Sequence, residues 1–194
     1  MTLIRVEPES IRRYGHAAQT IFDGMHSSLI ELVDQVVAVR YFGPNAFTFK
    51  SEVGRLAADF ANRLHVDMQS MSEAVRTSTT NIAAALGGSP ISIRLDPRPI
   101  TPPAPAAADF VDVDTAALEA LIPVVINRFE ALRGGLGSNV TQLQATDWQG
   151  NAKRLVVEAV TRVSSSARAR CDTAEVAITS FVRSQLEGVL AADR

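Results

Sequence analysis

Apolar residues recur at alternating spacings of four and three along most of this chain, and this periodicity is the strongest constraint on its fold. The first apolar stripe runs from Ile11 to Val39, and the next runs from Phe49 to Ile82. Both stripes are far longer than an ordinary strand, and no stretch of useful length alternates between apolar and polar residues. We therefore expect long amphipathic helices, each of which needs a partner to cover its apolar side.

Aromatic residues followed by glycine mark the places where the apolar stripes are interrupted. Glycine adopts backbone angles that other residues reach only with strain, so it suits a tight reversal between two long helices. Each half of the chain is therefore predicted to form a helical hairpin. The turn residues are Tyr41, Phe42 and Gly43 in the first half and Trp148, Gln149 and Gly150 in the second. Their aromatic rings either fill the gap between helix ends or stay partly exposed for a partner.

Trp148 follows Tyr41 by 107 residues, and the same offset aligns the two halves without a gap. Phe22 then matches Phe129, and Ile82 matches Val189. Few residues are identical, but apolar character is kept along both arms. We interpret the chain as one structural unit present twice. The alternative is a chance overlap of two amphipathic patterns.

A proline-rich segment separates the two halves. Residues 87–109 read GGSPISIRLDPRPITPPAPAAAD and hold six of the nine prolines. Proline has a fixed φ and no backbone N–H, so this density excludes helix and favours an extended strip. We expect one hairpin at residues 1–88, a linker at 89–109 and a second hairpin at 110–194.

Two hairpins can together bury four apolar stripes that neither hairpin covers alone. A helix over residues 45–86 is about 60 Å long at 1.5 Å per residue, and roughly 21 extended linker residues reach about 65 Å. This match favours hairpins packed antiparallel; a flexible tether is the alternative. The predicted fold is all-α, with two antiparallel hairpins forming an intrachain four-helix bundle. Such a covalent pseudo-dimer is expected to be monomeric.

The third helix is the one that the sequence specifies least. Asp114 is expected to open it, and Pro123 is expected to kink it near its start. Gly134, Gly135 and Gly137 are expected to loosen its second half.

No group of residues has the spacing of a catalytic or metal site. His16 and His26 are too far apart for the i, i+4 pair of a helical metal site, and His65 lies on another helix. We expect all three to be ordinary surface or boundary residues. Cys171 falls in the apolar stripe of the fourth helix and is expected to be a small buried side chain. We predict no enzymatic activity, no cofactor and no metal.

Composition argues against several classes of partner. The formal net charge of -2 provides no bulk attraction to nucleic acid or to a membrane. No apolar run approaches the ~20 residues of a membrane span. The first residues, MTLIRVEPES, lack the basic and apolar regions of a cleavable signal peptide. Any export is therefore expected to proceed without a removable leader.

An aromatic-x-Gly turn between two long helices resembles the Trp-x-Gly helical-hairpin proteins, the ESAT-like or WXG-hundred family. These are small substrates of bacterial type VII secretion that pair antiparallel as dimers. WQG at 148–150 matches their motif, whereas YFG at 41–43 has tyrosine in place of tryptophan. The resemblance covers both halves and leaves out the linker. It implies a tandem fusion of two such proteins, whose turns bind the secretion ATPase.

The export signal of that family has a second part, Tyr-x-x-x-Asp or Glu just past the last helix of one partner. The nearest match here is VLAAD, with Val189 and Asp193 at the right spacing but no tyrosine. Two functions follow from the resemblance. The chain is a secreted substrate recognised by the ATPase through its turns and C-terminal tail, or it is a cytoplasmic chaperone, adaptor or scaffold that binds a helical partner protein and is not exported.

Overall fold

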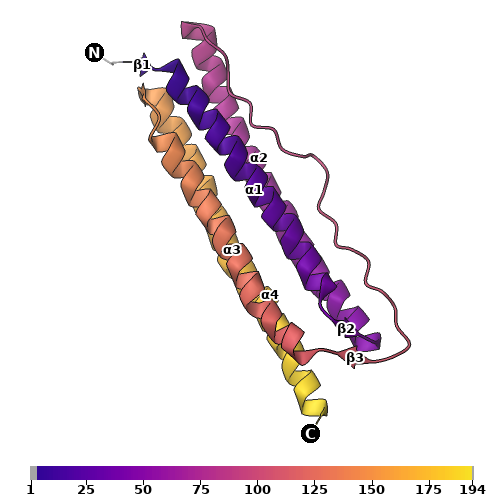
Figure 1. Cartoon of the computed structure of the whole chain (residues 1–194). Coiled ribbons are helices and arrows are strands. Elements are labelled where there is room, and N and C mark those ends of the chain that lie inside the picture. Colours follow the sequence, from indigo (N-terminus) through magenta and orange to yellow (C-terminus); the bar gives the residue numbers. More distant parts are fainter. Residues whose placement is uncertain (1–3, 194) are drawn as a thin grey trace. The chain divides into compact units, whose positions relative to one another are not determined.

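The computed structural model describes residues 4–193 and is all-α, as the periodicity predicts. Two short strands accompany each pair of helices, so that the chain runs β1, α1, β2, α2, β3, α3, β4, α4 (Figure 1). The helices are α1 (Pro8–Ala38), α2 (Pro44–Leu86), α3 (Thr115–Gln144) and α4 (Asn151–Ala192). The strands are β1 (Arg5–Val6), β2 (Tyr41–Phe42), β3 (Asp112–Val113) and β4 (Trp148–Gln149). Hairpin one denotes β1, α1, β2 and α2, and hairpin two denotes β3, α3, β4 and α4.

Acidic side chains cap the first helix of each hairpin. The Glu7 carboxylate accepts hydrogen bonds from the backbone N–H groups of Glu9 and Ser10. The Asp114 carboxylate accepts one from the N–H of Ala117, at 3.0 Å. The first N–H groups of a helix have no partner within it, so these carboxylates satisfy them and also favour the positive end of the helix dipole. Asp114 opens the third helix, as expected.

The chain divides into two compact units, and each contains a part of all four helices. Unit 1 comprises Met1–His26, Leu64–Pro97 and Arg133–Ala169, and unit 2 comprises Ser27–Arg63, Arg98–Leu132 and Arg170–Arg194. Each unit has its own apolar core, which includes Phe22, Met71 and Leu136 in unit 1 and Leu29, Phe49, Phe129 and Val182 in unit 2. The units therefore cut across both hairpins, and the assignment of 1–88, 89–109 and 110–194 as repeats and linker stays a prediction.

The short strands show how the hairpins are paired. In unit 1, β1 pairs with β4, and Val6 lies opposite Trp148. In unit 2, β2 pairs with β3, and Tyr41 lies opposite Val113. The turn of each hairpin thus lies against the open end of the other, which is the predicted antiparallel arrangement. The sequence analysis did not indicate these strands, because two-residue strands are too short to leave a periodic signal.

The backbone contacts at the two turns match at the 107-residue offset. The N–H of Glu7 donates to the carbonyl of Asp147 at 2.9 Å, and the N–H of Asp114 donates to the carbonyl of Arg40 at 3.0 Å. Glu7 and Asp114 are 107 residues apart, and so are Arg40 and Asp147. The two turns therefore make the same backbone contacts with different side chains.

Helix α3 is continuous from Thr115 to Gln144, with Pro123 inside it. The expectation that its glycines loosen the helix stays a prediction, but Gly135 also has a role in packing. A Cβ atom at this position would lie 2.7 Å from the side chain of Met25 on α1. Gly135 therefore allows α1 and α3 to approach closely, and packing between helices outweighs the low helix propensity of glycine.

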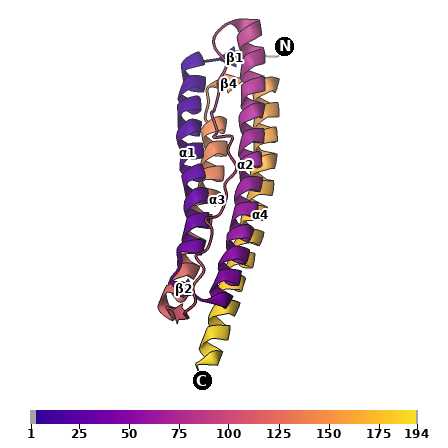
Figure 2. The ribbon, with the colours of Figure 1, turned by 90° about the vertical axis from the view of Figure 1, so that its right-hand side faces the viewer.

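The proline-rich segment contains no helix or strand, but it is fixed to hairpin one. In unit 1, Ile91 is buried against Gly15, where a Cβ atom would come within 3.1 Å of its side chain. In unit 2, the Asn62 amide group bonds both the N–H and the carbonyl of Ile100, at 2.9 and 2.8 Å. Figure 2 shows the segment running alongside α1 and α2. These contacts exclude a flexible tether for the part of the segment that they hold.

We predict that Gln19 controls access of proteases to the segment. Its amide group bonds both the N–H and the carbonyl of Arg94, at 2.8 and 2.9 Å. Gln19→Ala removes both bonds, so local opening should become easier and cleavage by trypsin after Arg94 should accelerate roughly 5- to 30-fold. Ser27→Ala, an exposed change on the same helix, is the control and should leave the cleavage rate unaltered. Equal rates for both variants would contradict this role of Gln19.

Candidate functional site

The aromatic residues of the two turns are buried rather than displayed. Tyr41 is 4% exposed and Trp148 is 2% exposed. The Tyr41 hydroxyl accepts a hydrogen bond from the Gln185 side chain at 2.8 Å, and its ring centroid lies 5.9 Å from that of Phe49. Of the two alternatives for these rings, the structure supports the one in which they fill the gap at the helix ends. The interpretation of Tyr41 and Trp148 as exposed docking groups is wrong.

The glycines beside these rings have the backbone angles that the reversal requires. Gly43 has a φ of 122° and Gly150 has a φ of 128°. Only glycine reaches this region without strain. The aromatic residue and the glycine of each turn therefore have a structural role. Any partner must contact the residues around them.

The turn of hairpin one carries an exposed aromatic cluster that the sequence pattern did not reveal. Phe42 is half-buried, and its ring centroid lies 5.8 Å from that of Phe110, which is 60% exposed. The Lys50 ammonium group lies 4.9 Å from the centroid of the Phe42 ring, a cation–π contact. Burial lowers the pKa of Lys50. The adjacent pair Phe110–Val111, between the prolines and β3, is the signal that could have indicated this cluster.

The turn of hairpin two is polar by comparison. Gln149 is exposed, and Arg5 forms a salt bridge with Asp147 at 3.2 Å. The Lys153 ammonium group donates to the carbonyls of Gln144 and Thr146, at 2.8 and 2.6 Å. Lys153 thereby satisfies the Gln144 carbonyl, which the end of α3 leaves without a helical partner.

The predicted C-terminal site lies on and just beyond the end of α4. Val189 is half-buried within the helix, and Asp193 is exposed one residue after its end. Val189 and Asp193 belong to unit 2 together with Tyr41, Phe42 and Gly43, whereas Trp148, Gln149 and Gly150 belong to unit 1. Arg194 lies outside the described residues.

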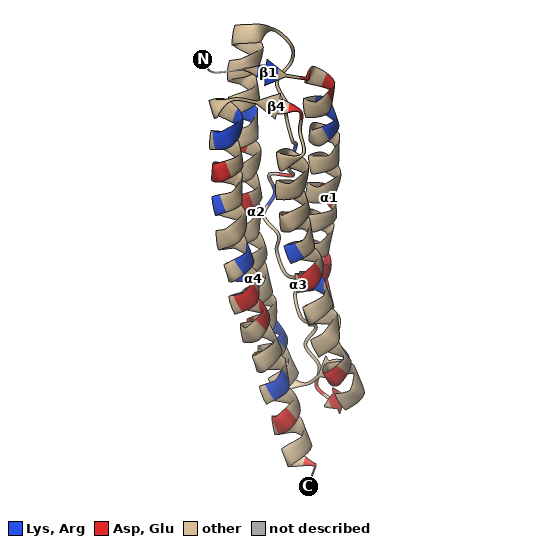
Figure 3. Cartoon of the chain, turned by 90° about the vertical axis from the view of Figure 1, so that its left-hand side faces the viewer, with Lys and Arg blue, Asp and Glu red and all other residues tan. Residues whose placement is uncertain are grey.

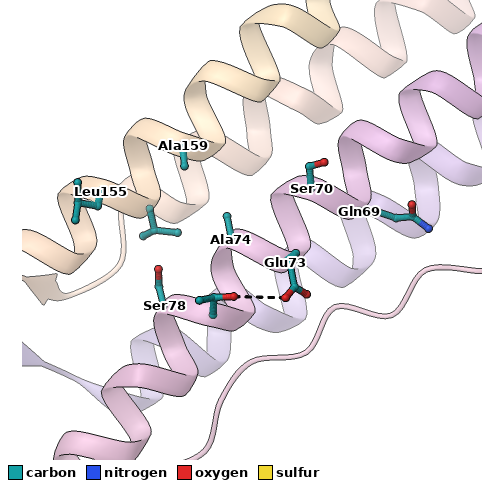
Figure 4. Close-up of a pocket in the computed structure, with 9 residues that line it drawn as sticks. Gln69, Ser70, Glu73, Ala74, Ser78, Leu155 and Ala159 are labelled. Atoms are coloured by element: carbon teal, nitrogen blue, oxygen red, sulfur yellow. Dashed lines mark hydrogen bonds between the residues drawn. The ribbon is translucent and has the colours of Figure 1, made fainter.

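A shallow groove runs between α2 and α4 in unit 1 (Figure 4). Its floor is made by Ala74, Val156 and Ala159, and its rim by Glu73 and Leu155. Leu155 is 50% exposed. Glu73 bonds the Thr77 hydroxyl and the Arg76 guanidinium, and the bond to Arg76 lowers the pKa of Glu73.

The predicted correspondence between the two halves relates this groove to a filled space in unit 2. At the 107-residue offset, Val156 corresponds to Phe49 and Ala74 corresponds to Phe181. In unit 2, Phe49 and Phe181 stack with their ring centroids 5.5 Å apart and fill the space between α2 and α4. The smaller side chains at the same positions in unit 1 leave that space open.

Two histidines meet in unit 1, although they lie on different helices. The ring centroids of His26 and His65 are 5.8 Å apart, and the Nδ1 atom of each is buried without a hydrogen-bond partner in the described chain. Burial, and secondarily the neighbouring His26, lowers the pKa of His65. The expectation of a surface or boundary residue holds for His26, which is half-buried, but it is wrong for His65, which is 7% exposed. Their contact was not predicted, because spacing along one helix cannot show a contact between two. Over residues 4–193, no three His, Cys, Asp or Glu side chains are grouped as metal ligands.

The remaining surface has mixed charge. Figure 3 shows acidic and basic residues interspersed along α4. Such a pattern provides no continuous basic strip for a nucleic-acid backbone. Cys171 is fully buried, as expected. None of the helices in the described part of the chain is long and apolar enough to cross a membrane.

Comparisons with known proteins return no relative. No protein-family model matches the chain, and neither a curated protein nor a solved structure is significantly similar to it.

Proposed function

We propose that this protein is a non-enzymatic, type VII secretion-associated protein of the Trp-x-Gly kind, exported as a folded substrate and recognised by the secretion ATPase. Support comes from the aromatic-x-Gly turns in an antiparallel pair of helical hairpins. Each turn lies against the open end of the other hairpin through a two-residue β ladder. A tandem fusion of two such proteins accounts for both hairpins and for the proline-rich connection between them.

In this proposal, the secretion ATPase binds the accessible residues around the turns and at the C-terminal end. Gln149 and Asp193 are exposed, and Phe42 and Val189 are half-buried. A partner can reach these side chains without unfolding the turns, whereas Tyr41 and Trp148 position the backbone beneath them. Asp193 supplies the acidic group of the tail signal, in a tail that has valine in place of the tyrosine.

The test is export from a bacterium with a type VII system, compared with the same strain lacking the secretion ATPase. We expect the full chain in the culture filtrate of the first strain only. Gln149→Ala combined with Asp193→Ala should lower the secreted amount roughly tenfold, because interface residues that matter cost more than about 1 kcal/mol each when truncated. The cellular amount and the helical circular dichroism should not change, since both residues are exposed.

Gln144→Ala combined with Glu187→Ala is the matched control, as it removes an exposed glutamine and an exposed acidic residue elsewhere. Secretion of this control should equal that of the unmodified chain. Export that does not require the ATPase, or that is unaffected by the Gln149 and Asp193 changes, would contradict the proposal.

The groove between α2 and α4 favours a second candidate, a cytoplasmic adaptor or chaperone that holds a helical partner protein. Its floor of small side chains lies where unit 2 buries two phenylalanine rings. A partner helix bearing an aromatic side chain has the shape to fill it. Retention of the chain in the cell under conditions that export other substrates would favour this candidate.

A further inference from the structure

A buried hydrogen bond joins the two hairpins in unit 1. The Tyr14 hydroxyl on α1 donates to Oδ1 of Asn139 on α3, at 3.0 Å. Tyr14 is 3% exposed and Asn139 is fully buried. Burial raises the pKa of Tyr14, so the hydroxyl keeps its proton. A buried polar group without a partner is strongly destabilising, and the Tyr14 hydroxyl and the Asn139 oxygen each depend on the other.

Neither the tyrosine nor the asparagine of this bond occurs at the equivalent position of the other hairpin. At the 107-residue offset, Tyr14 corresponds to Leu121 and Asn139 corresponds to Leu32. Both leucines are buried. Hairpin one therefore contributes a tyrosine and a leucine to these equivalent positions, and hairpin two contributes a leucine and an asparagine.

The salt bridges at the two turns also take a different type of residue from each hairpin. Arg5 pairs with Asp147 at 3.2 Å in unit 1, and Arg40 pairs with Asp112 at 2.9 Å in unit 2. The offset relates Arg5 to Asp112 and Arg40 to Asp147. These are equivalent bridges, and hairpin one supplies the arginine in both while hairpin two supplies the aspartate in both.

Pairing of like hairpins would break all three contacts. Two copies of hairpin one would place Arg5 against Arg40 and leave the Tyr14 hydroxyl against Leu32. Two copies of hairpin two would place Asp112 against Asp147 and leave the Asn139 amide against Leu121. Like charges would repel, and buried polar groups would lose their partners.

We propose that Tyr14, Asn139 and the two Arg–Asp bridges are specificity determinants that direct each hairpin onto a hairpin of the other kind. The partner surface of hairpin one fits hairpin two and rejects a second hairpin one. The chain consequently closes on itself, and copies do not associate through like hairpins. This pairing rule holds whether or not the protein is exported.

The buried Tyr14–Asn139 hydrogen bond contributes most of the preference for pairing unlike hairpins over like hairpins. The bridge side chains are largely exposed, 62% for Arg5 and 43% for Asp147. Exposed bridges contribute little because water and salt screen them. A single buried asparagine, in contrast, is known to fix the partner and register of coiled coils.

The test exchanges residues between equivalent positions of the full chain, which keeps the amino-acid composition constant. A half-exchanged chain carries Leu32→Asn, Asn139→Leu, Arg40→Asp and Asp147→Arg. In this chain, pairing of hairpin one with hairpin two leaves two buried polar groups without partners and brings like charges together twice. Pairing of two copies of the same hairpin leaves no such group or contact. A fully exchanged chain adds Tyr14→Leu, Leu121→Tyr, Arg5→Asp and Asp112→Arg, which restores every contact with the hairpin roles reversed.

We expect the unmodified and fully exchanged chains to sediment as monomers of 20.8 kDa. The half-exchanged chain should form species of about twice that mass, or its equilibrium constant for folding should fall roughly 100-fold or more. Recovery in the fully exchanged chain shows that pairing, and not local damage, is responsible. A half-exchanged chain as stable and monomeric as the original would overturn the proposal. A fully exchanged chain that recovers neither stability nor mass would overturn it too.

Discussion

Trp148→Ala is expected to lower the free energy of unfolding by about 3–5 kcal/mol, the cost of truncating a large buried aromatic side chain. Trp148 is 2% exposed and lies opposite Val6 in the β1–β4 ladder. Its removal leaves a cavity where the turn of hairpin two meets the start of hairpin one. Domains are stable by only about 5–15 kcal/mol, so this is a large fraction of the total. Denaturant unfolding followed by helical circular dichroism measures it, since the variant has no tryptophan fluorescence.

The matched control is Gln149→Ala, the next residue along β4. Its side chain is exposed, so its free energy of unfolding should stay within about 0.5 kcal/mol of the original. If Trp148→Ala unfolds at the same denaturant concentration as the control, the ring is not part of the core. A loss of export in Trp148→Ala could result from damaged folding as well as from lost recognition. The export test therefore substitutes exposed residues.

Gly43→Ala should destabilise the protein by about 1–3 kcal/mol, because a side chain is strained at a φ of 122°. Space is also short, since a Cβ atom would lie 3.2 Å from Cγ2 of Val111 and 3.4 Å from the carbonyl oxygen of Phe110. The substitution should therefore weaken the β2–β3 ladder and expose Phe42 and Phe110 further. The midpoint of thermal or denaturant unfolding measures the loss.

Gly24→Ala is the same chemical change in a helix, and it should have the opposite sign. Gly24 lies inside α1, and a Cβ atom there would meet no atom within 4 Å. Alanine should stabilise the helix by roughly 0.5–1 kcal/mol because it restricts the unfolded chain more than glycine does. A Gly43→Ala variant as stable as Gly24→Ala would show that the turn tolerates a side chain.

The hairpins and their turns could be predicted because their signals are local. The spacing of Phe49, Phe60 and Met71 fixes a helix, and Gly43 and Pro44 place its beginning. The candidate site was predicted less well. The turn residues were found, but Tyr41 and Trp148 are buried, and the exposed Phe110 was not identified.

By itself, the sequence determined four long helices, two glycine turns and an extended proline-rich segment, and it favoured the antiparallel order of the hairpins. Only the tertiary structure decided which residues from different helices meet, among them Tyr14 with Asn139 and His26 with His65. It also decided that Ile91 lies in the space left by Gly15. The physical reason is that periodicity fixes the face on which a residue lies. The register between packed helices depends on how side chains of many segments fit together at once.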